Sequence, residues 1–429
     1  MIESQTEIPS TRAVIRVTDT TINGNTTSED TVVFTDTVAF TYSSDMMQIG
    51  DPFSVAIPNP FGRYTGKFRP GARVTLYLQN PLVAGNARTL KSTGIVVKRR
   101  VESGSNGTLI QLECADLGWH LTNNAAPLWA PLSGNFSNLL KEGTWIDPSW
   151  GIDTQNFRTI NKNNNFRLNN GRAGIALAQQ QEGLLTPLQR IQSEPGDKVA
   201  DILITYARRL NYLINVACDG VFQLFRPNYD QTPLYHIEYH EQGEASVDQN
   251  NILSASVEED ITNRWTSTLC VGEVVIPKVV PDAAQVNATQ NSLKFRGQLS
   301  AQKELPFVHR MSFSDGEIFR SEDAAPMAYW RYKNDKFNSF KAVYRLRNHH
   351  QNGVWWESDT MCSVNDTVNG VIGKYYVSSV NYTRDEQGDL VEVNLRLPNL
   401  LEPYFSSVKG TESIRQSNGI YLIKAEASL

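Results

Sequence analysis

The chain has 429 residues, room for roughly two to four domains, and its formal net charge is −5. Proteins that hold nucleic acid mainly by electrostatics need a basic surface, so this charge disfavours that class. Hydrophobic residues make up 40% of the chain and aromatic residues 10%, too many for a disordered protein. Charged residues make up only 20% of the chain, a low share that favours a sheet-rich protein with large interfaces.

The sequence shows neither a targeting segment nor a cysteine motif. The N-terminal sequence lacks the basic and apolar regions of a signal peptide, and no apolar run approaches the ~18 residues of a membrane-spanning helix. We therefore expect no membrane insertion. The four cysteines are far apart and form no C-x-x-C pair, so we expect buried free thiols rather than metal ligands. They are Cys114, Cys218, Cys270 and Cys362.

Short strands with turns between them are expected in residues 1–120. Val74, Leu76 and Leu78 alternate with polar neighbours, which places them on one face of a strand. Pro70-Gly71 just before them has turn chemistry. Regular short strands favour a barrel or a sandwich. The predicted strands cover residues 12–17, 31–35, 53–57, 73–78, 94–99 and 108–114.

A small α+β module is expected in the middle of the chain. Apolar residues recur at helical spacing from Val199 to Leu210, which predicts an amphipathic helix. Asp219-Gly220 then separates two apolar runs, as a two-residue hairpin turn requires. Before this helix, residues 119–172 show no period and include an Asn-rich run at 161–170, which predicts a long surface loop or insertion.

A second strand-rich region is expected over residues 251–400. Strands are predicted at 252–257, 265–271, 340–347 and 391–397. A helix is predicted at 323–337, because Pro326 falls in its first turn, where the missing N–H costs little. Residues 281–303 are polar and without pattern, so we expect a flexible loop there.

The most ligand-like cluster is the run from His236 to Glu241. On a strand, His236, Glu238 and His240 share one face and could approach a metal ion. A polar strand face is the favoured interpretation, because the sequence supplies no third His or Cys nearby. His349-His350 is expected to lie solvated in a polar loop, and the basic run at 98–100 to be a solvated strand end.

No catalytic, metal-binding or cofactor-binding residues are predicted. The nucleophile elbow, the phosphate-binding loop and the dinucleotide glycine fingerprint are all absent. Trp355-Trp356 could form a sugar-stacking platform, although core packing of at least one indole is favoured. Pairs of acids for glycoside hydrolysis could be drawn from Asp147, Asp153, Glu241 and Glu259, but spacing in sequence cannot show their geometry.

The order of these features resembles the baseplate hub family of bacteriophage tails, which includes the phage Mu tail hub and the late control protein D relatives. The resemblance rests on residues 51–78, on 92–117, on the helix-and-hairpin from 195 to 220, and on 251–398. The helix-and-hairpin is its most specific part. The residues that carry the family motifs are Pro70, Gly71, Asp116, Pro195, Gly196, Asp219, Gly220, Trp355 and Pro398.

The resemblance implies a mainly β fold in which two β-barrel hub domains flank a helix-plus-hairpin module. The implied boundaries are 1–120 for the first tube-like domain, 121–250 for the module, 251–400 for the second tube-like domain and 401–429 for a C-terminal tail. The hub would be a structural homotrimer without cofactors, forming a pseudo-sixfold ring in the virion tail baseplate after assembly in the host cytoplasm. Its implied partners are the tail tube protein and the central spike, with tape measure and baseplate wedge proteins as further candidates, and DNA would pass through the lumen without specific binding.

Two other classes stay open at this stage. A tail-associated peptidoglycan or glycan hydrolase would need a carboxylate pair in a cleft. A non-catalytic carbohydrate-binding β-protein would use Trp355 and Trp356.

Overall fold

The chain is mainly β and divides into two compact units, Met1–Ala255 with Val343–Leu395 and Ser256–Ala342 with Arg396–Leu429, called the first and second units below. None of the helices in the part of the chain that is described is long and apolar enough to cross a membrane. The computed structural model describes residues 10–23, 26–35, 37–64, 66–83, 88–104, 107–127, 145–160, 167–168, 195–209, 212–241, 249–272, 296–300, 305–315, 321–386, 388–398, 415–417 and 420–424.

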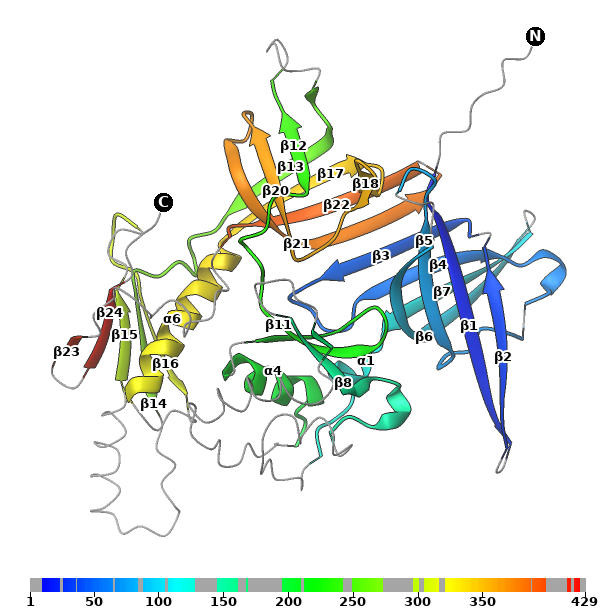
Figure 1. Cartoon of the computed structure of the whole chain (residues 1–429), viewed down its shortest axis with the longest axis horizontal. Coiled ribbons are helices and arrows are strands. Elements are labelled where there is room, and N and C mark those ends of the chain that lie inside the picture. Colours follow the sequence, from blue (N-terminus) through cyan, green and yellow to red (C-terminus); the bar gives the residue numbers. More distant parts are fainter. Residues whose placement is uncertain are drawn as a thin grey trace. The chain divides into compact units, whose positions relative to one another are not determined.

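A long sheet organises the first unit (Figure 1). One end of the sheet is formed by the hairpin of β1 and β2. Strands β20 and β12 form a branch, in which β20 pairs with β21 and β12 pairs with β20. Two strands, β13 (Ile252–Glu259) and β17, run across the boundary between the units. In spatial order the sheet contains β17 (Phe340–Arg347), β22 (Gly388–Arg396), β21 (Val371–Asp385), β3 (Ala39–Asp45), β4 (Pro52–Pro58), β7 (Gly107–Asp116), β6 (Thr89–Gly104), β5 (Arg73–Gln79), β1 (Arg12–Asn23) and β2 (Thr26–Phe34), with β20 (Thr360–Asp366) and β12 (Tyr235–Tyr239) beside it.

The joint between the N-terminal and C-terminal strands is the antiparallel pair β3–β21. Its register runs from Ser379 opposite Asp45 to Arg384 opposite Phe40. The Ser43 hydroxyl also donates a 2.6 Å hydrogen bond to Asn381. The expected mainly β fold is confirmed, but the described strands form open sheets, the long one mostly antiparallel, rather than closed barrels. The reason is this joint, because strands of the two predicted barrels pair with each other in one sheet.

The alternation of apolar and polar residues in the sequence determines which side chains of this sheet are buried. Val74, Leu76 and Leu78 on β5 are fully buried, and the apolar residues of β4 are buried in the same alternating pattern. The six strands predicted in the first 120 residues are confirmed as β1, β2, β4, β5, β6 and β7. Strand β3 is an addition, because its polar Ser43 and Ser44 hide the alternation begun by Phe40 and Tyr42.

The middle module contains the predicted helix and hairpin. Helix α4 (Val199–Arg209) precedes β10 (Leu213–Val216) and β11 (Val221–Phe225), and the sheet order is β10-β11-β8-β9. Gly220 in the hairpin turn has φ of 86°, a left-handed value that glycine adopts without strain. Residues of the predicted loop instead form α1 (Trp119–Asn123), the 3-10 turn η3 (Pro148–Trp150) and β8 (Asp153–Ile160), because β8 pairs in parallel with β11. Of the Asn-rich run, only β9 (Arg167–Leu168) is described.

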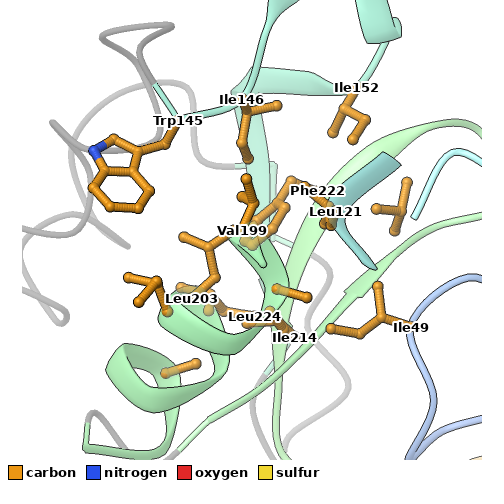
Figure 2. Packing of buried hydrophobic residues seen from close by; sticks show 14 of the residues in the cluster. Ile49, Leu121, Trp145, Ile146, Ile152, Val199, Leu203, Ile214, Phe222 and Leu224 are labelled. Atoms are coloured by element: carbon orange, nitrogen blue, oxygen red, sulfur yellow. The ribbon is translucent and has the colours of Figure 1, made fainter. Parts of the chain in front are cut away.

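Buried apolar side chains from these elements form one cluster (Figure 2). The α4 residues Val199 and Leu203 pack with Phe222 and Leu224 of β11. Ile49, from the loop between β3 and β4, belongs to the same cluster, so the module shares a core with the long sheet. Burial of aliphatic and aromatic side chains at about 1.5–3 kcal/mol each makes this shared core a strong attachment.

In its described residues, the second unit contains a five-stranded sheet and the helix α6. Its order is β16-β14-β15-β24-β23, and α6 packs on β14, β15 and β24. One expectation is corrected here, because part of the predicted loop at 281–303 is the strand β15. Residues 401–429 include the two strands β23 and β24, and β24 pairs in parallel with β15. The bounds are β14 (Ser267–Gly272), β15 (Arg296–Ser300), β16 (Arg310–Asp315), α6 (Ser321–Asn338), β23 (Arg415–Ser417) and β24 (Ile420–Lys424).

Gly94 on β6 is the tightest backbone contact among the glycines of the long sheet that are described. A Cβ atom there would lie 1.8 Å from the carbonyl oxygen of Ala115 on β7. We expect Gly94→Ala to lower the free energy of unfolding by about 3 kcal/mol, because the β6–β7 ladder must open to admit the methyl group. Gly104→Ala on the same strand is the control, since nothing lies within 4 Å of its Cβ position. Urea unfolding measures both, and equal stabilities of the two variants would contradict this packing.

Candidate functional site

A polar pocket of about 330 Å³ lies where the long sheet meets the β10–β11 hairpin within the first unit. Strand β3 contributes Tyr42, β6 contributes Lys91 and Ser92, and the hairpin contributes Cys218. The segment before β20 contributes Glu357. Segments far apart in sequence therefore meet at one place, which makes the pocket the candidate functional site.

Two buried acids, Asp51 and Asp116, form one wall. Asp51 precedes β4 and Asp116 ends β7, and the antiparallel register of these strands places the two side by side, with the Asp116 N–H donating to the Asp51 carbonyl at 3.0 Å. The carboxylates accept backbone N–H bonds, Asp116 from Gly118 at 2.8 Å and Asp51 from Asp45 at 3.1 Å. Asp116 therefore fixes the turn into α1.

Burial controls the protonation of this pair. It raises the pKa of Asp116 to about 7, even though backbone N–H bonds favour the charged form. Burial, followed by the charge of Asp116, raises the pKa of Asp51 well above its usual range. Two carboxyl groups close together in a poorly hydrated place do not both ionise readily, so the pair retains a proton near neutral pH.

Lys91 lines the same pocket, with its side chain only 6% exposed. Its ammonium group contacts the Glu357 carboxylate at 3.0 Å and lies 5.2 Å from the Trp355 ring and 5.7 Å from the Tyr382 ring. The Tyr42 hydroxyl donates to the Lys91 carbonyl at 3.1 Å. An ammonium group held by a carboxylate and two aromatic faces acts as a structural tie, because cation–π and ionic contacts both require its charge.

Several motif residues gather around this pocket. Asp116 lines it, and Trp355 packs on the lysine next to it. Asp219-Gly220 turns the hairpin directly after Cys218, and a Cβ at Gly220 would lie 3.1 Å from the Leu117 side chain. Motif residues from three separate stretches of the sequence therefore lie where the long sheet meets the β10–β11 hairpin.

The other motif residues lie elsewhere. Pro70 and Gly71 form the turn before β5, where Gly71 has φ of 89°. Pro195 and Gly196 lie in the turn before α4, where Gly196 has φ of 107°. Pro398 follows β22.

The predicted strand face of His236, Glu238 and His240 is present on and next to β12. Glu238 binds both imidazoles, His240 at 2.8 Å and His236 in a short contact, and Asn365 donates to it at 2.9 Å. Partial burial works against ionisation, yet these hydrogen bonds lower the pKa of Glu238. Within the described ranges, no three His, Cys, Asp or Glu side chains are placed to hold a metal ion. The acid thus serves to tie the two histidines together.

Side-chain amides cover the outer edge of β12. Three amide side chains, from Asn250, Asn251 and Gln351, pair with backbone groups that a neighbouring strand would otherwise use. The side-chain oxygens of Gln351, Asn251 and Asn250 accept the N–H groups of His236, Glu238 and His240, respectively. In return, the side-chain NH₂ groups of Asn251 and Gln351 donate to the His236 carbonyl, and that of Asn250 donates to the His240 carbonyl.

Four acids considered from sequence are placed away from the pocket lining. Asp147 accepts the Ser149 N–H at 2.8 Å, and Asp153 accepts the Gln155 N–H at 3.0 Å, so each stabilises its own turn. Glu241 and Glu259 are exposed. The sequence reasoning missed Asp51 and Asp116, because only the β4–β7 register brings them together.

Burial confirms one expectation and corrects two. Trp355 is 5% and Trp356 1% exposed, so both indoles pack in the core, as was favoured for at least one of them, and neither can stack on a sugar. His349 is fully buried, not solvated, because its ring packs beside the rings of Phe40 and Tyr382. Cys218 is exposed in its hairpin turn, whereas the other three cysteines are buried as expected.

Solved structures give the first comparison with other proteins. A tail protein of Neisseria meningitidis matches with a TM-score of 0.65 at 14% identity, over 92% of this chain and 98% of its own. The 43 kDa tail protein of the Shewanella oneidensis prophage MuSo2 matches with a TM-score of 0.63 at 14% identity, over 91% and 99%. A prophage tail protein of Listeria monocytogenes matches with a TM-score of 0.50 at 10% identity, over 92% and 99%.

No family model matches the chain, and no curated protein does. The fold shared with phage tail proteins nevertheless extends over nearly the whole of both chains. The expected resemblance to bacteriophage tail proteins is therefore confirmed at the level of the fold.

The buried acid pair makes stability depend on pH. The unfolded chain releases the Asp116 proton near pH 4 and the folded chain near pH 7, so the folded state binds more protons between these values. The free energy of unfolding should therefore fall as pH rises from 4.5 to 7.5, by up to ~1.4 kcal/mol per pH unit for one proton. We expect Asp116→Asn to flatten this fall, because the amide keeps an acceptor for Gly118 and does not titrate.

Urea unfolding at four pH values between 4.5 and 7.5 tests this, with Asp147→Asn as the control. The pKa of Asp147 is lowered by its bonds to Ser149, so its titration lies below the window and its slope should equal that of the wild type. A wild-type slope in the Asp116→Asn variant would contradict a shared buried proton.

Proposed function

We propose that this chain is a structural protein of a phage-type tail, a baseplate hub that acts through its surfaces rather than by catalysis. The observation that carries the proposal is the fold, which matches tail proteins over more than nine-tenths of both chains. The family motif residues Asp116, Asp219, Gly220 and Trp355 support it, because they lie together where the long sheet meets the module.

The proposed assembly is a homotrimer. Strands of the first and last thirds of the chain would each supply one segment of a ring, so three chains would present six similar segments. Such a pseudo-sixfold ring would join a sixfold tail tube to a threefold central spike, with tape measure and wedge proteins as further neighbours. The position of β2 at the end of the long sheet, with no further neighbour among the described strands, supports ring closure between chains, because an unpaired strand edge readily accepts a partner.

The proposed location follows from the assembly. The ring would lie in the virion tail after assembly in the host cytoplasm, and its lumen would pass DNA without binding it specifically. The net charge of −5 is compatible with this, because the chain as a whole is not basic and phosphate groups are held mainly by basic surfaces. The proposed domain boundaries remain those read from the sequence, with the tube-like segments at 1–120 and 251–400.

A catalytic role has less support. The acids in the pocket accept backbone N–H bonds, and the Lys91 ammonium is tied to Glu357, so the polar groups named there hold the fold. The buried state of Trp355 and Trp356 removes the platform on which the carbohydrate-binding alternative depended.

The mass of the purified protein tests the proposal. We expect light scattering to give about 144 kDa, three times the 48.1 kDa of one chain, and negative-stain class averages to show a ring. Zymography on peptidoglycan, with the Asp116→Asn variant beside the wild type, is expected to show no clearing. A monomer that clears peptidoglycan would replace the hub by the hydrolase.

A further inference from the structure

The charges that line the polar pocket do not balance. Its acids are Asp51, Asp116 and Glu357, and Lys91 is the one base among the residues described for its lining. Lys91 and Glu357 neutralise each other across their 3.0 Å contact. Asp51 and Asp116 are 6% and 4% exposed, so this pair places up to two negative charges in a poorly hydrated position. Buried charges of one sign are unfavourable unless an opposite charge joins them.

The strand registers place a hydroxyl group on the same face of the sheet as these carboxylates. Gly94 of β6 lies opposite Asp116 of β7, which in turn neighbours Asp51. Ser92 stands two residues before Gly94, in a stretch of β6 that pairs regularly with β5. Side chains two residues apart on a strand point to the same face, so Ser92 points to the side of the acid pair. Ser92 also lines the pocket.

The Ser92 hydroxyl is a second, independent sign of a ligand. Ser92 is 2% exposed, and its Oγ has no hydrogen-bond partner in the part of the chain that the structure describes. Buried hydroxyl groups nearly always have a partner, because burial removes their hydration. The oxygen lone pairs of Ser92 are therefore available to a cation that lies beside the two carboxylates.

The donor atoms identify the class of this cation. Carboxylate and hydroxyl oxygens are hard ligands, which Mg²⁺ and Ca²⁺ prefer, and two negative charges match a divalent ion. Zn²⁺ would instead require several His or Cys ligands, and no described group of three His, Cys, Asp or Glu side chains is placed to hold a metal. Two carboxylates and one hydroxyl leave coordination positions for water, which fits a pocket of about 330 Å³.

We infer that the pocket binds one hard divalent cation, Mg²⁺ or Ca²⁺, between the carboxylates of Asp51 and Asp116 and the hydroxyl of Ser92. The ion compensates the charge that the acid pair otherwise limits by retaining a proton. Asp116 also accepts the Gly118 N–H at the turn into α1, so the ion connects the long sheet to the middle module. This site goes beyond the proposed function and does not depend on the proposed trimer.

Isothermal titration calorimetry of the full chain tests the site. The protein is first dialysed against a chelator and then titrated with MgCl₂ or CaCl₂ at about pH 7.5, above the Asp116 pKa of about 7. We expect one ion per chain with a Kd of about 0.1–1 mM, the range of weak sites built from oxygen ligands. Asp51→Asn and Asp116→Asn should each weaken binding at least about tenfold, because each removes one of the two charges.

Ser92→Ala is the decisive variant, because it removes one hydroxyl group and no charge. It should weaken binding by about threefold or more, as expected for the loss of one neutral ligand. Asp147→Asn is the matched control for the acids, since Asp147 caps its own turn at Ser149. Ser103→Ala is the control for the hydroxyl, since Ser103 is exposed on the same strand and contacts Thr108. Both controls should bind like the wild type, and far-UV circular dichroism confirms that each variant is folded.

The results decide between a specific site and general attraction of cations. Saturable binding of Mg²⁺ or Ca²⁺ that is weakened in the three site variants and unchanged in the two controls supports the inference. Absence of saturable binding up to about 10 mM, tenfold above the weakest expected Kd, overturns it. Unchanged binding in folded Asp116→Asn or Ser92→Ala overturns it as well. Equal weakening by Asp147→Asn, or saturation by Zn²⁺ alone, also contradicts a hard-cation site in this pocket.

Discussion

The pairing of β3 with β21 is the constraint on which the first unit depends. Ser43 and Asn381, bonded across this pair, are 338 residues apart in the chain. Closing a loop of that length costs about 5 kcal/mol of chain entropy. The pair offsets this with its ladder of hydrogen bonds and with burial of Phe40 and Tyr42, each worth about 1.5–3 kcal/mol. Without it, the N-terminal and C-terminal strands would be two separate sheets with open edges.

The polar pocket is a consequence of that pairing. Tyr42 of β3 reaches the Lys91 carbonyl, and the Tyr382 ring of β21 lies near the Lys91 ammonium. Trp355 and Glu357, which precede β20, complete the environment of the same lysine. The contacts come from both sides of the β3–β21 joint, so the lysine and its neighbours fasten the joint on one face of the sheet. The acid pair fastens the middle module at the adjoining position.

Local patterns could be predicted from the sequence, and long-range registers could not. Period-two alternation located β4 and β5, and Asp219-Gly220 located the hairpin, because these signals need only neighbouring residues. The meeting of Asp51 with Asp116 depends on the register of β4 against β7, and no local pattern encodes it. Strand β15 escaped prediction because its residues are largely polar and its place is set by β14 and β24. His349 was misjudged because its polar sequence context concealed its burial beside Phe40.

The order in which the two units occur along the chain has a consequence for synthesis. The second unit begins at residue 256, before the first unit has received its strands from residues 343–395, and it is completed only by residues after 396. Translation at about 5–20 residues per second leaves β3 without β21 for tens of seconds. Each unit needs residues from two separate segments of the chain, so neither unit can fold completely while the chain is still short. The protein therefore cannot fold one unit after the other from its N-terminus during translation. Its unpaired strands must stay apart from those of other nascent chains until nearly the whole sequence has emerged.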